Sequence, residues 1–205
     1  MKNTKKWYLM VLFVVFCAVV FSCASSGGAK AAAEPAVPTL ATGEWMVYND
    51  ENDKGSSTVK IESAEEVIDG KTVMVHHVTG NVTTKFQYGF AGWGLNHDEK
   101  TLELYKTAKS VSFWILGDGQ KYSIKFKTSN IRDFAYYEYT FETKKGEPLY
   151  VEVPMKFFMQ PSWGRFVRLD PALAAGIEWQ THESWRKTPD KNPFDIKMWG
   201  FTIYN

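Results

Sequence analysis

The sequence has few cysteines, no excess of charge of either sign and no long apolar run. Among its 205 residues only Cys17 and Cys23 carry thiols, which is too few for a disulfide framework. The 24 basic and 23 acidic side chains nearly cancel, whereas nucleic-acid-binding proteins normally show a basic excess. The apolar run at residues 7–21 is shorter than the roughly 20 residues that favour a membrane-spanning helix. These shortages argue against a disulfide-rich scaffold and a nucleic-acid-binding protein.

Aromatic residues are plentiful. They make up 16% of the chain and include 8 Trp, and hydrophobic residues as a whole make up 44%. A chain of this length and composition can bury the core of one domain preceded by a leader. We therefore expect a single folded, aromatic-rich domain.

The N-terminus has the features of an export signal. Three lysines within the first six residues precede the apolar run, which ends at Ser22-Cys23. This pattern resembles a bacterial lipoprotein signal, in which the leader is cut before the cysteine and that cysteine is lipidated. An ordinary secretory signal or an uncleaved anchor is the alternative. The resemblance implies a lipid-anchored protein of the bacterial cell envelope, on the periplasmic face or at the cell surface.

Removal of the leader changes what the mature chain contains. The leader takes Cys17 and three lysines with it, which leaves 21 basic against 23 acidic side chains. Lipidation of Cys23 then leaves no free thiol, which excludes cysteine catalysis, zinc held by cysteine and disulfides. The lipid supplies membrane affinity, so no further hydrophobic segment is needed.

Composition divides the rest of the chain into a tether and a domain. Residues 24–42 are mostly Ala, Ser, Gly and Pro without helical or strand periodicity, which is typical of a flexible linker. We expect a signal peptide at 1–22, a lipidated tether at 23–42 and a β-domain at 43–205.

From Gly43 onward, short alternating segments separated by turn residues predict an all-β sandwich. The expected strands are 58–63, 71–79, 91–95, 110–117, 120–128, 136–142, 149–154, 176–180 and 196–204. Only 171–175 and 155–158 have helical character, each for a single turn.

Residues 110–128 contain the most specific strand pattern. Asp118-Gly119 is typical of a two-residue type I′ turn, and it separates two alternating segments. With that turn, the apolar residues on one face of a hairpin meet in pairs: Val111 with Phe126, Phe113 with Ile124, and Ile115 with Tyr122. A slip of one residue would destroy this sorting, so the pattern predicts a β-hairpin with this register.

The same hairpin leaves Trp114 on a face of Ser and Lys residues, near Lys125. The simple alternative is that a loop or the N-terminal segment covers this indole. An exposed indole instead offers a platform for a sugar ring, because the C–H face of a pyranose is apolar and complements the π face. We therefore interpret Trp114 and Lys125 as candidate carbohydrate contacts.

The run from Trp114 to Thr128 resembles the Gly-Asp-Gly-containing hairpin of the complex I intermediate-associated protein 30 family. Other segments follow in the order expected for that family: Gly55-Ser56-Ser57, Gly80, Gly89-Phe90-Ala91-Gly92, Tyr137 to Phe141 with Thr143, Val151 to Pro154, Phe157-Phe158, and Met198 to Ile203. The family is similar to family 11 carbohydrate-binding modules. The resemblance implies a galactose-binding-like jelly roll over residues 43–205, and a fold of this kind implies binding more often than catalysis.

Aromatic and charged residues gather in the predicted loops, where sandwich domains commonly bind ligands. The alternative is that these tryptophans plug the ends of the sandwich. The candidate ligand contacts are Trp114, Lys125, Trp163, Arg165, Trp179 and Trp185, with Trp93 and His182 behind them.

Metal sites and catalytic sites have weaker support. His76 and His77 are adjacent on a predicted strand, so they point to opposite faces and cannot share an ion. Asp50, Glu51 and Asp53 are oxygen ligands that could hold calcium, although three acids in a turn are also typical of a solvated surface. We assign no metal site and no required cofactor.

A glycosidase needs two carboxylates that face each other across a cleft. Glu138, Glu178 and Glu183 are available, yet the sequence pairs none of them. No phosphate loop, nucleophile motif or zinc signature is present. We therefore expect a protein that is not an enzyme.

Two functions from different classes remain. The first is a non-catalytic, lipid-anchored module that binds carbohydrate or another envelope component through an aromatic-rich surface. The second is a structural or assembly protein that uses the same surface to hold a protein partner in the periplasm.

Overall fold

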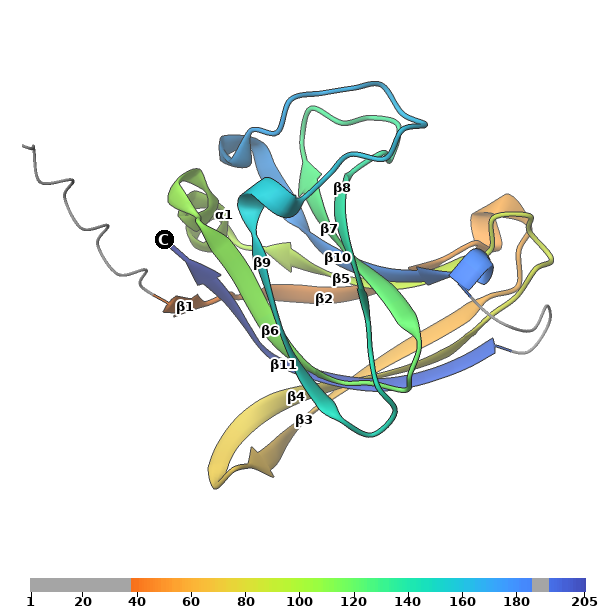
Figure 1. Cartoon of the computed structure of the whole chain (residues 1–205), viewed down its shortest axis with the longest axis horizontal. Helices are drawn as coiled ribbons and strands as arrows, with labels where there is room; N and C mark the ends of the chain where they lie inside the picture. Colours follow the sequence, from red (N-terminus) through yellow and green to blue (C-terminus); the bar gives the residue numbers. More distant parts are fainter. Residues whose placement is uncertain (1–37, 186–191) are drawn as a thin grey trace, which may run out of the picture. The chain divides into compact units, whose positions relative to one another are not determined.

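Two antiparallel β-sheets form the domain, as Figure 1 shows for the computed structural model, which describes residues 38–185 and 192–205. Sheet A has the order β3 (Thr58–Ile68), β4 (Lys71–Val82), β11 (Asn192–Tyr204), β6 (Ser110–Leu116) and β9 (Pro148–Pro154), with β1 (Pro38–Leu40) also paired to β11. Sheet B has the order β2 (Gly43–Asn49), β5 (Phe90–His97), β10 (Ala174–His182), β7 (Lys121–Thr128) and β8 (Tyr137–Glu142). The predicted all-β jelly-roll sandwich is confirmed.

Helical segments are short and connect the strands. They are η1 (Glu51–Asp53), α1 (Glu99–Leu104), η2 (Tyr105–Thr107), η3 (Met155–Phe157), η4 (Pro171–Leu173) and η5 (Glu183–Trp185). Asp98 caps the start of α1, because its side chain accepts the backbone N–H of Thr101 at 2.8 Å. None of the helices in the described part of the chain has the length and apolarity to cross a bilayer.

All nine expected strands are present, several with longer ends, and two further strands were missed. β1 has only three residues, and the edge strand β2 has four consecutive apolar or aromatic residues at 45–48 in place of an alternating pattern. Pro38 pairs with Tyr204, so the sandwich begins before Gly43 and the expected tether boundary at residue 42 was too late. The signal peptide, Cys23 and most of the expected tether lie outside the described residues.

The predicted hairpin at 110–128 is wrong, although its apolar face is right. β6 pairs with β11 and β9 in sheet A, whereas β7 pairs with β10 and β8 in sheet B, so residues 117–120 cross between the sheets. Of the two turn residues only Gly119 has a positive φ, at 87°, whereas a type I′ turn needs two. Alternation shows which side chains face the core, but it does not show which strands are partners.

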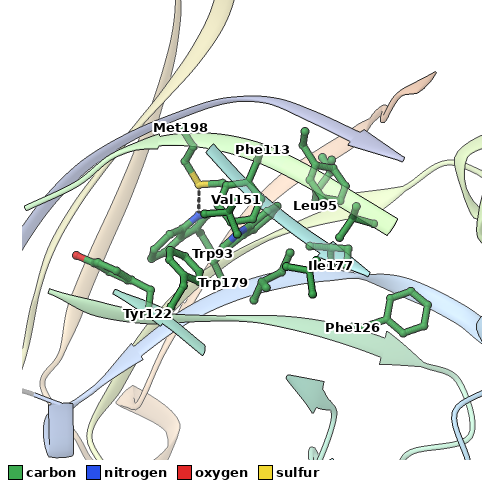
Figure 2. Packing of buried hydrophobic residues seen from close by; sticks show 14 of the residues in the cluster. Trp93, Leu95, Phe113, Tyr122, Phe126, Val151, Ile177, Trp179 and Met198 are labelled. Atoms are coloured by element: carbon green, nitrogen blue, oxygen red, sulfur yellow. Dashed lines mark hydrogen bonds between the residues drawn. The ribbon is translucent and has the colours of Figure 1, made fainter. Parts of the chain in front are cut away.

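The apolar residues that the hairpin would have paired instead meet across the sandwich. Phe113 of β6 and the β7 side chains Tyr122 and Phe126 are fully buried in one core (Figure 2). Burial of apolar side chains in one core is the main source of stability of such a domain.

Trp93 and Trp179 occupy the centre of this core, as Figure 2 shows. The Trp93 Nε1–H group donates to the Sδ atom of Met198 at 2.9 Å. The ring of Trp179 lies 5.4 Å from Phe113 and 5.3 Å from Phe201 between ring centroids. Both indoles are 0% exposed, so the prediction that they contact ligand is wrong.

Candidate functional site

The outward side of sheet B carries a continuous set of polar residues. Alternation on each strand turns these side chains away from the core. We call this set the polar face, and it consists of Tyr48, Lys121, Ser123, Lys125, Lys127, Glu138, Thr140, Glu178, Gln180 and His182.

Strand register places opposite charges side by side at the middle of the polar face. Lys125 of β7 pairs with Glu138 of β8 on one side and with Glu178 of β10 on the other. The same strand carries Lys127, whose Nζ lies 2.5 Å from Oε1 of Glu178. One row across three strands therefore alternates acid, base and acid.

Glycines on β5 make room for the side chains at the other edge of the face. The ring of Tyr48 lies over Gly92, where an added Cβ would fall 2.2 Å from the ring Cζ. The side chain of Glu178 lies over Gly94 in the same way, with Cγ 2.9 Å from such a Cβ. A larger residue at Gly92 would displace Tyr48 from the face.

Hydrogen bonds fix the centre of the polar face. The Lys125 ammonium donates to Oε1 of Gln180 at 2.5 Å. The Tyr48 hydroxyl also reaches Oε1 of Gln180, at 3.4 Å, and the backbone oxygen of Trp179 at the same distance. Three polar side chains from three strands are thus held in a fixed arrangement.

These groups are recessed although they point away from the core. Glu178 is 7% exposed and Ser123 is 1% exposed, and the Ser123 hydroxyl has no hydrogen-bond partner within the described residues. Burial lowers the pKa of Lys125 and raises the pKa of Glu138. Burial, followed by the nearby Glu178 carboxylate, raises the pKa of Tyr48 well above its usual value. Desolvated ionisable groups gathered in one place are typical of a binding site.

Aromatic rings lie at both ends of the lysine row on β7. At one end the ring of Trp185 lies 3.7 Å from the ring of His182 and 5.4 Å from Nζ of Lys121. At the other end Nζ of Lys127 lies 5.5 Å from the ring of Tyr136. Between these rings the face offers ammonium donors and amide and carboxylate acceptors. Such a combination can stack on the C–H face of a sugar ring and bind its hydroxyls.

Three of the predicted contacts, Lys125, His182 and Trp185, therefore lie on one face. Tyr48 and Gln180 were missed. Tyr48 belongs to a strand that was not predicted. Gln180 directly follows the core residue Trp179, so its side chain points to the opposite side of the sheet. The register of β7 and β10 brings Gln180 to Lys125, and no pattern within either segment shows that pairing.

Trp114 lies on the outward side of the other sheet. It contacts Trp199 of β11 and Tyr150 of β9, with ring centroids 6.1 and 5.1 Å away. We call these three residues the aromatic row. Trp114 is 39% exposed and Tyr150 is 40% exposed, so the expected exposed indole exists. Lys125 lies on sheet B, however, and the prediction that it neighbours Trp114 is wrong.

Trp163 and Arg165 belong to the loop between η3 and η4. Trp163 is 65% exposed, and the backbone N–H of Arg165 donates to Oδ2 of Asp133 at 2.8 Å. These two residues are accessible, but they come from a loop and not from the strands that form the polar face.

The three acids considered for calcium do not form a site. Asp50 is fully buried and accepts the backbone N–H and the hydroxyl of Ser57 at 2.9 and 2.7 Å. Glu51 and Asp53 are exposed on η1. Within residues 38–185 and 192–205 no three His, Cys, Asp or Glu side chains are gathered as a metal site.

Comparison with known proteins gives one family and several similar folds. The sequence model of the family "Complex I intermediate-associated protein 30" matches residues 36–177 of this chain. No curated protein sequence matches. A family 11 carbohydrate-binding module of the cellulase Lic26A-Cel5E from Clostridium thermocellum has a similar structure, with 16% identity, coverage of 83% of this chain and 95% of that chain, and a TM-score of 0.53.

Weaker likenesses extend to other modules. A family 29 carbohydrate-binding module mutant is 13% identical, covering 72% of this chain and 91% of its own, with a TM-score of 0.35. A family 4 module is 13% identical, covering 82% of this chain and 95% of its own, with a TM-score of 0.39. The family 11 module establishes the shared jelly-roll fold.

Proposed function

Because the chain belongs to the complex I intermediate-associated protein 30 family, we propose that it is a non-catalytic module that binds carbohydrate through the polar face of sheet B. The observation that carries this proposal is the recessed cluster of Tyr48, Lys125 and Gln180, in which hydrogen bonds fix the polar groups before a ligand arrives. The fold shared with a carbohydrate-binding module supports the same function.

Preorganisation explains why such a face suits a sugar. A sugar presents many hydroxyls whose hydration must be replaced on binding, and donors and acceptors that are already held in place lose little entropy. Lys125 has two further donor positions beyond its bond to Gln180, and Tyr136 and Trp185 supply rings at the two ends. The ligand class is therefore a neutral or weakly charged oligosaccharide.

The charge arrangement supports binding without catalysis. Glu138 and Glu178, two of the three carboxylates considered for glycoside hydrolysis, lie on strands separated by β7, with Lys125 between them. Glu178 forms an ion pair with Lys127. The Glu178 carboxylate is therefore engaged by an ammonium group of the same face.

The test is a glycan array of soluble oligosaccharides and polysaccharides, followed by calorimetric titration with the strongest hits. Lys125→Met should weaken binding at least tenfold, and Lys71→Met, an exposed lysine on sheet A, should leave it within twofold. The melting temperatures of both variants report whether the fold is intact. If the folded protein binds no glycan, or if Lys125→Met binds as tightly as wild type, the polar face is not a carbohydrate site.

The location of the protein is a further part of the proposal. The basic start, the apolar run and Ser22-Cys23 support a lipid anchor on Cys23 that holds the module at the bacterial cell envelope. Metabolic labelling with a palmitate analogue should mark the wild-type protein, and Cys23→Ala should abolish the label. Labelling that persists in Cys23→Ala would contradict the anchor.

A protein partner is the second candidate function, and the aromatic row favours it. Trp114, Trp199 and Tyr150 cross three strands of sheet A, where aromatic residues in a central position are typical of protein interfaces. Crosslinking in cells from a photoreactive residue at Tyr150 should capture one defined envelope protein. Crosslinking only to scattered proteins would remove this candidate.

A further inference from the structure

Two loops at one end of the sandwich expose large aromatic side chains beside unpaired arginines. The first joins β7 to β8 and the second joins η3 to η4, and both lie at the top of Figure 1. We call the exposed residues of these loops the loop patch: Arg132, Phe134, Trp163, Arg165, Phe166 and Arg168. Phe166 is 83% exposed and Phe134 is 72% exposed, which are high values for phenylalanine.

The loop that carries Phe166 packs on the core, so the exposure of Phe166 does not result from a loop without core contacts. Val167 and Leu169, on the same loop as Phe166, are partly buried against the hydrophobic core. The loop therefore buries its smaller apolar residues and presents Trp163 and Phe166 to the outside. A mobile segment with no packing would not sort its residues in this way.

A hydrogen bond joins the two loops, because Asp133 accepts the backbone N–H of Arg165 at 2.8 Å. Within the second loop, Gln160 accepts the backbone N–H of Val167 at 2.8 Å. Gly164 approaches Ala135 so closely that an added Cβ would lie 2.0 Å from the Ala135 Cβ. These contacts hold the backbone that carries the aromatic side chains of the loop patch in a defined position.

Phe134 also has an unusual backbone conformation. Its φ of 63° is in the left-handed region, which is rare for a bulky residue and carries a conformational cost. A packed core residue would recover that cost through burial, yet the Phe134 side chain is exposed. A strained backbone conformation whose free-energy cost is not offset by packing of the side chain is typical of a functional position.

The charged side chains of the loop patch are all arginines. Arg132, Arg165 and Arg168 form no ion pair within the part of the chain that the structure describes. The two loops also carry Asp133 and Asp170, whose carboxylates accept backbone N–H groups, and Asp133 interacts electrostatically with Arg165. The two loops therefore present aromatic rings with three arginines against two carboxylates, an excess of one positive charge.

The position of the loops relative to the chain's entry point adds an independent argument. Pro38, where the described chain begins, pairs with Tyr204. The Lys109 backbone connects this strand end to η3, because its N–H donates to Tyr204 and its carbonyl accepts from Met155. These bonds place η3, which precedes the loop of Trp163 and Phe166, next to the strand end that Pro38 joins.

We propose that the loop patch docks onto an anionic lipid bilayer, with Phe134, Trp163 and Phe166 in the headgroup region and the arginines on the phosphates. Trp and Phe prefer the membrane interface, and unpaired arginines attract anionic lipids. About 15 residues separate the expected lipid on Cys23 from Pro38, so a reach of up to about 50 Å allows this end of the domain to meet the bilayer. The lipid would retain the protein at the membrane, and the loop patch would set its orientation.

Vesicle binding of residues 35–205 tests this proposal, because every strand of both sheets and the whole buried core lie within that segment. The segment should co-sediment with phosphatidylglycerol vesicles, and raising the salt concentration should weaken the binding. Trp163→Ser combined with Phe166→Ser should weaken it at least tenfold. The matched control, Val67→Ser with Tyr88→Ser, removes equally exposed side chains elsewhere and should change it less than twofold.

The arginines are tested in parallel. Arg165→Gln with Arg168→Gln should reduce both the affinity and its salt dependence, whereas Lys71→Gln with Lys85→Gln, two exposed lysines outside the loops, should not. All four double variants should keep the wild-type melting temperature within about 3 °C and, where a glycan ligand is found, the wild-type sugar affinity. The proposal is overturned if the folded wild-type segment does not bind anionic vesicles. It is also overturned if the control pairs weaken binding as much as the loop pairs do.

Discussion

The tryptophans of this protein show that residue type alone does not predict whether a side chain is buried or exposed. Trp93 and Trp179 fill the core, Trp114 lies in the aromatic row, and Trp163 stands exposed on a loop. All four were candidates for ligand contact from the sequence. Their environments differ because neighbouring positions on a strand face opposite sides, and which side is inward depends on how the strands assemble.

These environments predict different costs of truncation. Trp179→Ala removes a fully buried indole and should lower the free energy of unfolding by about 3–5 kcal/mol. Trp114→Ala removes a partly exposed ring and should cost less than about 1.5 kcal/mol. Urea denaturation of both variants measures the difference. Equal costs would show that Trp114 is also part of the core.

His97 predicts a specific pH dependence. Burial lowers its pKa below the usual 6.5, and its ring contacts the Tyr105 hydroxyl and the backbone oxygen of Thr42. The unfolded chain therefore binds a proton more readily than the folded one. This residue contributes stability above pH 6.5, and that stability is lost as the pH falls through 6.5 towards the lower folded pKa. The loss is at most about 1.4 kcal/mol per pH unit for one histidine.

Urea denaturation at pH 7.5 and 5.5 tests this assignment. The wild-type protein should lose more stability between these pH values than His97→Gln does, because glutamine has no proton to gain. His76, whose pKa is also lowered by burial, contributes in the same direction and remains in both proteins. An equal loss in the two proteins would rule out His97 as a source of the acid sensitivity.

At the scale of elements, the segment that follows β2 depends on Asp50. Its carboxylate accepts the backbone N–H and hydroxyl of Ser57 and the backbone N–H of Phe90, so it connects η1 to the starts of β3 and β5. Gly55 packs against the same carboxylate, where an added Cβ would lie 2.1 Å from Cγ. The small-residue motif at 55–57, which contributed to the family resemblance, thus has a local structural reason.

Asp50→Ala should therefore destabilise the protein, because it leaves buried donors without an acceptor. We expect a loss of about 3 kcal/mol in the free energy of unfolding. Asp53→Ala, on the same turn but exposed, should change it by less than about 0.5 kcal/mol. Thermal and urea denaturation check both values, and a neutral Asp50→Ala would contradict the role of this carboxylate.

Strand pairing marks the limit of what the sequence could predict at this scale. The alternation in 110–128 correctly identified Phe113, Ile115, Tyr122 and Ile124 as core residues. It failed to pair them, because two strands on opposite sheets of a sandwich have the same inward pattern as two strands of one hairpin. The edge strand β2 was also missed, and with it Tyr48, because its seven residues carry no distinctive turn signal.

For the whole molecule, the fold could be predicted and the site only in part. Turn spacing, alternation and the family resemblance were sufficient for a jelly-roll sandwich. The polar face could not be assembled, because it depends on long-range register that brings Lys125 to Glu138, Glu178 and Gln180. Each of these residues looks like an ordinary solvated strand position in isolation. Only the strand register of the assembled sheet brings them together as a recessed cluster.

We propose different roles for three surfaces of the molecule. The polar face of sheet B would bind carbohydrate, the loop patch would dock on the bilayer, and the aromatic row of sheet A is the candidate surface for a protein partner. The η3–η4 loop, which carries the tested loop-patch residues Trp163, Arg165, Phe166 and Arg168, contributes no residue to the polar face, so variants there should leave sugar binding unaffected. A domain that both docks on lipid and keeps its polar face free would present that face to envelope glycans.

Mapping the sugar site by NMR tests the central claim most directly. Residues 35–205, labelled with nitrogen-15, would be titrated with the oligosaccharide that binds best on the array. The account predicts that the largest amide shifts fall on Tyr48, Lys125 and Gln180 and their strand neighbours. Shifts concentrated at Trp114, Trp199 and Tyr150, or a titration without shifts at the polar face, would contradict it.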